Sequence, residues 1–382
     1  MAKRWQLPLV LVASMAVTGC SWFGSDDEVK PEPLVQFEAE KEVERLWSAS
    51  AGSGSESIYL NLTPAIDGNS IFAADADGEV FGFDRKTGDR LWQTDLDVKL
   101  SGGVGAGYGI VAVALESGSV IALDSATGEE RWRASVGSEV VSQPQMNESL
   151  LVVQAIDGKV TAFDASTGER RWVYDAQIPN LTLRGTSSPI VVANATFAGF
   201  ANGKLVALDN ETGNEIWSRR VALPKGRSEL ERMVDIDGRP LLRDRMLYVP
   251  SYQGRLAAID PFSAQVVWAE EISTFHSIAE GYGNLYVSDT DDAVQAVDRS
   301  SSASVWHQPA LANRQISAPV TSASEVLVAD FEGYIHVMSQ LDGRFVARYK
   351  FDSSGVSGDM LVVDDIIYVL SNDGQLAALT IN

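Results

Sequence analysis

The chain has 382 residues, 45% of them hydrophobic, with a single cysteine and a formal net charge of -22. This acidic balance disfavours nucleic acid and anionic lipid surfaces as partners, because both repel a negatively charged protein. Length alone would allow two domains.

The first 19 residues have the pattern of a secretion signal. Lys3 and Arg4 form a basic start, Leu7 to Val17 is an apolar run, and Val17-Thr18-Gly19 is a small-residue cleavage site. The apolar run is too short to span a bilayer. Removal of the signal leaves a mature chain whose side chains have a formal net charge of -24, since Lys3 and Arg4 are the only charged residues of the signal.

Val17-Thr18-Gly19-Cys20 resembles the bacterial lipobox, in which the cysteine is lipidated and becomes the first mature residue. An ordinary signal peptide with an incidental cysteine is the alternative, but Cys20 is the only cysteine and follows the cleavage point directly. Several acyl chains anchor a protein firmly. The residue after the lipidated cysteine is thought to decide which membrane such a lipoprotein reaches. Here it is Ser21 rather than aspartate, which implies the outer membrane. Residues 20–41 are acidic, contain Pro31 and Pro33, and predict a flexible tether.

From residue 42 to 382 one pattern recurs, and its clearest copy runs from Asp157 to Trp172. The first-turn positions lie 38 to 51 residues apart, at 78, 118, 158, 203, 254, 292, 333 and 374. Asp157-Gly158 suits a tight hairpin, the following strand is apolar on both faces, and Asp164 to Gly168 forms a second turn. A repeat of this size made of short strands indicates a β-propeller.

The eighth unit, from Asp373, ends before its outer strand. Val43 to Trp47 carries the terminal tryptophan of a repeat without the turns that should precede it. We therefore predict an all-β, eight-bladed propeller of four-stranded blades, closed by the amino-terminal strand, because closure removes open edges. The repeat tryptophans hold one fixed place and are interpreted as structural: Trp47, Trp92, Trp132, Trp172, Trp217, Trp268 and Trp306.

The repeat resembles that of quinoprotein dehydrogenases, which hold pyrroloquinoline quinone and a metal ion and often use adjacent cysteines. This chain has only Cys20, and its three histidines, His276, His307 and His336, lack ligand spacing. His336 replaces an apolar strand residue and is interpreted as structural. We expect no catalytic residue, no cofactor and no metal. A periplasmic quinoprotein oxidoreductase remains the alternative function.

Two successive units are enlarged. The distance from the tryptophan to the next turn glycine is 26 positions after Trp132, 31 after Trp172 and 37 after Trp217. Insertions in repeat proteins emerge as loops on one face and often carry function. The inserted segments contain the pairs Leu181 and Leu183, and Asp235 and Asp237, each projecting from one side of an extended segment. A partner surface and an internal salt bridge of Arg184 with an aspartate explain these residues equally well.

The lipobox, acidic tether, eight repeats, Leu-x-Leu-Arg-Gly and Arg-x-x-Asp-x-Asp together resemble the BamB family, propeller lipoproteins of the outer-membrane β-barrel assembly machinery. The resemblance covers the whole chain. It implies docking to the POTRA domains of BamA through residues matched by position: Leu181, Leu183, Arg184, Asp235 and Asp237.

The resemblance thus predicts a non-enzymatic scaffold, lipid-anchored to the outer membrane with its propeller in the periplasm. It would dock on BamA among the other components of the machinery and assist the folding and insertion of β-barrel precursors. Direct contact with unfolded precursors, by strand addition, is a conjecture.

Overall fold

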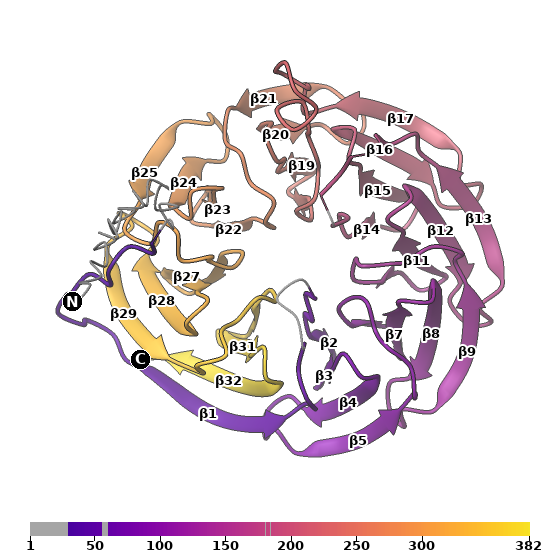
Figure 1. Ribbon diagram of the computed structural model, residues 1–382, viewed down its shortest axis with the longest axis horizontal. Coiled ribbons are helices and arrows are strands. Elements are labelled where there is room, and N and C mark those ends of the chain that lie inside the picture. Colours follow the sequence, from indigo (N-terminus) through magenta and orange to yellow (C-terminus); the bar gives the residue numbers. More distant parts are fainter. Residues whose placement is uncertain (1–29, 56–59, 180, 184) are drawn as a thin grey trace, which may run out of the picture. The chain divides into compact units, whose positions relative to one another are not determined.

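The computed structural model describes residues 30–55, 60–179, 181–183 and 185–382. Pro31 to Asn382 form one compact unit. Its strands make eight four-stranded sheets, arranged as blades around a central axis (Figure 1). Neighbouring strands within each blade are antiparallel. The predicted eight-bladed propeller is confirmed.

The four strand positions in a blade have different lengths and environments. The innermost strands are two or three residues long: β2 (Ala65–Asp67), β6 (Gly105–Gly107), β10 (Gln145–Met146), β14 (Ile190–Val191), β18 (Leu241–Arg243), β22 (Ala279–Gly281), β26 (Val320–Ser322) and β30 (Leu361–Val363). The second strands are longer: β3 (Ser70–Ala74), β7 (Ile110–Leu115), β11 (Leu150–Gln154), β15 (Ala195–Gly199), β19 (Met246–Val249), β23 (Asn284–Ser288), β27 (Glu325–Ala329) and β31 (Ile366–Leu370).

The third strands follow the first turn of each repeat: β4 (Glu79–Asp84), β8 (Ser119–Asp124), β12 (Lys159–Asp164), β16 (Lys204–Asp209), β20 (Leu256–Ile259), β24 (Val294–Asp298), β28 (Tyr334–Ser339) and β32 (Gln375–Ile381). The outermost strands form the rim: β5 (Arg90–Asp95), β9 (Glu130–Ser135), β13 (Arg170–Asp175), β17 (Glu215–Arg220), β21 (Val266–Glu270), β25 (Ser304–Gln308), β29 (Phe345–Lys350) and β1 (Val43–Ser50). We number the blades 1 to 8 in the order of their innermost strands, so that blade 1 contains β2 and blade 8 contains β30.

Burial explains the apolar pattern of the repeat. Every residue of β7 and β11 is buried, because the second strands are covered on both faces by the neighbouring blades. The outer strand β13 instead has exposed residues around a buried Trp172. Apolar side chains from adjacent blades therefore form one cluster per joint, such as Phe163 of blade 3 with Trp132 of blade 2.

The ring is closed as the sequence predicts. β1 pairs antiparallel with β32, from Val43 opposite Ile381 to Ser50 opposite Gln375. Glu42 and Asn382 also exchange two backbone hydrogen bonds, of 3.2 and 2.9 Å. The two ends of the propeller thus share blade 8, and the first and last strands lie side by side (Figure 1).

The tryptophans of the outer strands join each blade to the next. Every indole Nε1–H donates to a backbone carbonyl in the turn between the third and fourth strands of the following blade, at 2.8 to 3.0 Å. The donor and acceptor pairs are Trp47–Arg85, Trp92–Ser125, Trp132–Ala165, Trp172–Asn210, Trp217–Pro261, Trp268–Arg299 and Trp306–Gln340. These contacts support the structural interpretation of the tryptophans.

The turn that receives the indole is built by Asp164 and Gly168. The Asp164 carboxylate accepts the backbone N–H groups of Ser166 and Thr167, both at 3.0 Å. Gly168 has a φ of 73°, and a Cβ atom there would lie 2.6 Å from the Trp132 ring. Glycine is therefore favoured here both by the left-handed backbone and by the indole packed against it.

One tryptophan is replaced, and the structure gives the reason. Ala347 of β29 faces the joint between blades 7 and 8 and is buried. In blade 8 the third and fourth strands, β32 and β1, are not consecutive in the chain, so no turn joins them. The position that accepts the indole in the other blades, seven residues after the first turn, is Ile381 here, and it lies in β32 opposite Val43. A tryptophan at position 347 would have no such turn to cover. The sequence showed the substitution but gave no explanation for it.

The tether predicted for residues 20–41 is described only from Lys30, so Cys20 and the signal at 1–19 lie outside the described residues. Pro31 to Lys41 belongs to the compact unit and lies against blade 7. Among the described residues, no helix is long and apolar enough to cross a membrane.

Replacing Trp172 with alanine removes a buried ring and its hydrogen bond to Asn210. We expect the free energy of unfolding to fall by about 3–5 kcal/mol, as for other large aromatic truncations in cores. Denaturant unfolding of the purified protein measures this. A loss below about 1 kcal/mol would show that the joint does not depend on the indole.

The role of glycine in this turn can be tested by opposite substitutions at Gly168 and at its counterpart in blade 5. Gly168→Ala places a Cβ against Trp132 and forces a left-handed alanine, so we expect a loss of about 2 kcal/mol or more. Blade 5 already has Ala264 at this position, with a φ of 57°. Ala264→Gly relieves that backbone and loosens the unfolded chain, so stability should change by no more than about 1 kcal/mol. Equal losses in the two variants would contradict this account of the turn.

Candidate protein-docking site

The two enlarged loops meet on one face of the propeller. The first joins β13 to β14 and the second joins β17 to β18, so each runs from an outer strand to the next innermost strand. A Cβ atom on Gly185 of the first loop would lie 2.2 Å from Oδ1 of Asp237 in the second. The structure therefore brings the two predicted segments into direct contact, and we call them the paired loops.

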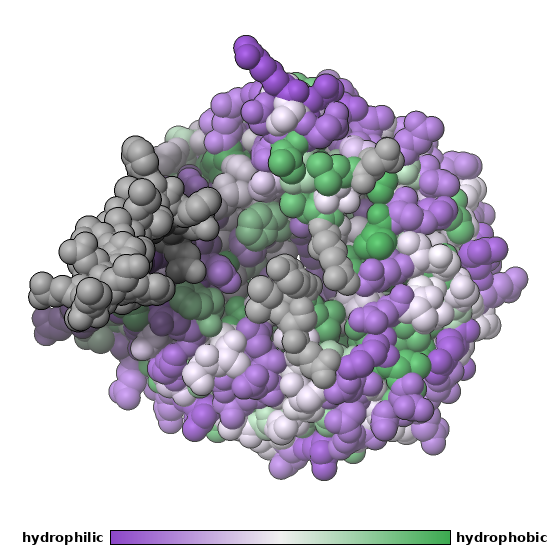
Figure 2. All heavy atoms as spheres, in the orientation of Figure 1, coloured by the Kyte–Doolittle hydropathy of each residue, from purple (hydrophilic) through white to green (hydrophobic). Residues whose placement is uncertain are grey.

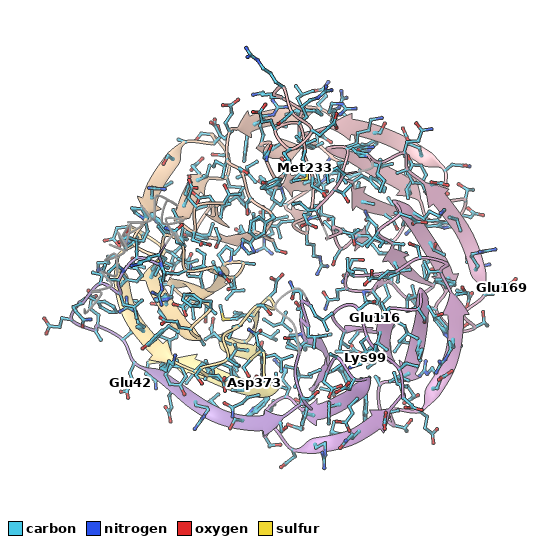
Figure 3. The ribbon with its side chains drawn as sticks, viewed as in Figure 1. Glu42, Lys99, Glu116, Glu169, Met233 and Asp373 are labelled. Atoms are coloured by element: carbon cyan, nitrogen blue, oxygen red, sulfur yellow. The ribbon has the colours of Figure 1, made fainter. Side chains whose placement is uncertain are left out.

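The second loop is fixed to the propeller around Asp235. Asp235 and Tyr252 exchange two backbone hydrogen bonds, of 2.7 and 3.4 Å. Val234 and Ile236 are buried, and Ile236 packs directly on Gly199 of blade 4. Asp235, which lies between them, is buried as well, and Asp237 is partly buried. Met233, which precedes them, lies over β19 (Figure 3).

Both aspartates are held in unfavourable surroundings. Asp235 is 2% exposed, and its Oδ2 has no hydrogen-bond partner in the part of the chain that the structure describes. Burial, with a smaller contribution from the charge of Asp237, raises the pKa of Asp235 to about 8. Burial raises the pKa of Asp237 to about 7. Buried carboxyl groups are normally paired, so this arrangement costs stability and marks a candidate functional site.

The leucines of the first loop differ in exposure. Leu181 is 44% exposed and Leu183 is partly buried. Arg184 lies outside the described residues, so neither its predicted docking role nor the alternative salt bridge has a structural description. The second loop adds Leu223 and Leu230, exposed by 50% and 64%. Figure 2 shows apolar side chains gathered on this face over blades 4 and 5.

Sequence reasoning missed three of these residues. Leu223 and Leu230 lie within the enlarged second segment, and their apolar character was the available signal. Gly185 was read only as part of a motif, although it allows the close approach of Asp237. Contact between loops more than 40 residues apart could not be read from spacing alone.

A channel with both polar and apolar lining runs beside the paired loops and is the other candidate site. Its volume is about 1070 Å³, and its lining includes Asp237, Arg239, His276 and Asp359. Ser277 Oγ donates to Asp359 Oδ2 at 3.0 Å. Burial lowers the pKa of His276 to about 4, so its ring is neutral. Among the described residues, no group of three or more histidine, cysteine, aspartate or glutamate side chains is placed to hold a metal ion.

The remaining histidines serve no common site. His307 is on β25, with its Nε2 3.9 Å from Asp289 Oδ2. His336 is on β28, fully buried, and bonded to Asp330 and Arg348. These contacts support the interpretation of His336 as a structural residue.

Fold and site together define a β-propeller of quinoprotein-type repeats whose distinctive surface is a pair of loops. The family model for outer membrane protein assembly factor BamB matches residues 33–97 and 76–308. The chain is 54% identical over 378 residues to BamB of Pseudomonas aeruginosa, with 99% of both chains covered. It is 34% identical over 392 residues to BamB of Yersinia pestis, with 100% of both covered. The chain belongs to the BamB family of outer membrane protein assembly factors.

Solved structures agree with this assignment. The crystal structure of BamB from Moraxella catarrhalis matches with a TM-score of 0.82 and 26% identity, covering 89% of this chain and 100% of that one. A europium-containing methanol dehydrogenase matches with a TM-score of 0.71 but 14% identity, covering 88% and 93%. The second similarity shows a shared fold alone.

The raised pKa values of Asp235 and Asp237 give a testable pH dependence. Between the ordinary aspartate pKa near 4 and their folded values of about 8 and 7, the folded chain keeps protons that the unfolded chain has released. Stability should therefore fall as the pH rises from 5 to 9. Asp235→Asn should weaken this dependence and be more stable than the native chain at pH 9.

Thermal unfolding at several pH values checks this prediction, with the exposed Asp373 as the matched Asp→Asn control. An Asp235→Asn variant less stable than the native chain at pH 9 would contradict it. That result would show that the carboxylate is compensated within the chain.

Proposed function

We propose that this protein is a non-enzymatic scaffold that docks through the paired loops on the POTRA domains of BamA. There it assists the folding and insertion of outer-membrane β-barrel proteins. The observation that carries this proposal is the contact of Gly185 with Asp237, which brings the loop of the exposed Leu181 against the loop of Asp235 and Asp237. Membership of the BamB family of outer membrane protein assembly factors supports the proposed process.

The chemistry of the surface suits a protein partner. Leu181, Leu223 and Leu230 offer an apolar area beside polar and charged residues, as at the centre and rim of protein interfaces. Asp235 and Asp237 belong to the same pair of loops, and Oδ2 of Asp235 has no hydrogen-bond partner among the described residues. A cationic group of the partner would favour their charged forms, so docking would recover the stability that the free chain loses.

The alternative is a quinone-dependent periplasmic oxidoreductase. The channel has room for a small molecule, and quinoprotein dehydrogenases share the fold. The single cysteine, Cys20, cannot supply the adjacent pair often used over the cofactor. The channel lining described here offers three aspartates around one arginine, Arg239, and these carboxylates disfavour an acidic quinone. We therefore favour the scaffold.

The same proposal includes the membrane anchor. Lipidation of Cys20 would attach the chain to the outer membrane and leave the propeller in the periplasm. Glu32 is bonded to Ala312, in the loop between β25 and β26. That loop and the paired loops all join an outer strand to the next innermost strand, so they share one face. The chain thus leaves the propeller on the face that would dock.

Binding of residues 31–382 to purified BamA POTRA domains tests the proposal. Leu181→Ala and Arg184→Ala should each weaken binding, the arginine change by about 2 kcal/mol or more as expected of a hot spot. Neither should lower the melting temperature greatly. Leu341→Ala is the matched control, since Leu341 is 73% exposed on a turn of the opposite face.

Three other results would count against the proposal. Folded native protein that does not bind the domains would remove the proposed partner. Equal weakening by Leu181→Ala and Leu341→Ala would remove the proposed site. A large fall in the melting temperature of Arg184→Ala would favour the internal salt bridge.

A further inference from the structure

The amino-terminal segment Glu32–Lys41 lies along the rim of blade 7, outside the four strands of that blade. The backbone N–H groups of Glu40 and Lys41 both donate to the Val346 carbonyl, at 2.9 and 3.1 Å, and Glu32 N–H donates to the Ala312 carbonyl at 3.0 Å. The segment passes the outer strand β29 before entering β1 (Figure 1). This placement is not part of the propeller repeat.

An aromatic contact anchors the middle of the segment. Phe37 stacks on Phe345 of β29, with ring centroids 5.6 Å apart. The Arg348 guanidinium lies over both rings, at 5.1 Å from Phe37 and 5.4 Å from Phe345. Its Nη1 also donates to the Val35 carbonyl at 2.9 Å. One arginine thus recognises a ring and a backbone carbonyl together.

Charged contacts hold the two ends. Arg344 makes a two-point ion pair with Glu40, of 3.1 and 2.9 Å. Arg314 Nη1 donates to the Glu32 carbonyl at 3.1 Å. The acid therefore lies three residues after the aromatic ring, at a spacing matched by Arg348 on β29 and by Arg344, which directly precedes β29.

Buried groups beneath the rim orient the arginines. His336 Nε2 is 3.0 Å from Asp330 Oδ2, and Arg348 Nε donates to His336 Nδ1 at 3.1 Å. Asp330 also accepts from Arg314 Nε at 2.8 Å. Because Arg348 occupies Nδ1 as a donor, the neutral ring carries its proton on Nε2. The propeller therefore supplies contacts of its own to both arginines, in addition to those that the segment makes with them.

The segment itself is loosely packed. Phe37 and Leu34 are partly buried, while Val35 is 45% exposed and most of the other residues are exposed. Segments with few buried contacts open at low free-energy cost. A pre-oriented receptor with a weakly packed occupant has the properties of a binding site rather than of a structural joint.

We propose that the rim of blade 7, formed by Phe345, Arg344, Arg348 and Arg314, is a peptide-binding groove that this chain fills with its own segment Val35–Glu40. The groove selects an extended segment with an aromatic residue followed three positions later by a carboxylate. Recognition combines backbone bonding at an edge strand with side-chain contacts. This inference is independent of the proposed docking to BamA.

The test uses residues 31–382, which form one compact unit. In that unit, Phe37→Ala with Glu40→Ala should empty the groove. Hydrogen exchange at the amides of residues 40 and 41 should then become at least tenfold faster. A fluorescent peptide of residues 32–42 should bind the emptied unit saturably. It should not bind the native unit at the same concentration, because the tethered segment competes at an effective millimolar concentration.

Two controls locate the binding. A peptide with Phe37→Ala should bind at least tenfold more weakly than the native peptide. Arg344→Ala in the emptied unit should weaken peptide binding severalfold without changing its melting temperature, since Arg344 is exposed and bonds only Glu40 and Asp342 among the described residues. Arg131→Ala, a matched exposed arginine paired within blade 2, should have no effect.

Two results would overturn the proposal. Faster exchange without peptide binding would show that the rim is not a receptor. Unchanged exchange in the double variant would show that Phe37 and Glu40 do not hold the segment.

Discussion

The joint between neighbouring blades is the interaction on which the structure depends. A propeller has no single core, so each blade must be held to the next by contacts that repeat around the ring. Here the indole of an outer strand donates to a turn carbonyl of the following blade and covers a glycine of that turn. The aspartate, glycine and tryptophan of the repeat are three parts of this one contact. In blade 8, where no turn joins the third and fourth strands, the preceding outer strand has Ala347 in place of the tryptophan.

Most of the fold could be predicted from the sequence because the joint is local in each repeat. The spacing of Gly158, Gly168 and Trp172 specifies two turns and the strand between them, and Trp47 reveals the displaced outer strand. Features outside the repeat were not accessible in this way. The docking of Phe37 on Phe345 joins positions more than 300 residues apart, with no periodic signal. His336 could be recognised as structural, but its role beneath Arg348 required the structure.

The candidate docking site, unlike the joints between blades, could be predicted only in part from the sequence. Loop length identified the two segments from the sequence. The alternation of the charged Asp235 with the apolar Ile236 was also visible in the sequence. The contact of Gly185 with Asp237 arises from packing between the two loops. At the joints the indole N–H groups all find acceptors, whereas Oδ2 of the buried Asp235 has no hydrogen-bond partner among the described residues. Such a local departure from good packing is expected where a surface is maintained for a partner.

The central claim, that the paired loops are the docking surface, is tested most directly by placing a photo-reactive side chain at position 181 of the full-length protein in cells. A second protein with the same group at position 341, on the opposite face, provides the comparison. The account predicts an adduct with BamA from position 181 and none from position 341. An adduct from position 341 alone, or from neither position in a folded protein, would contradict it.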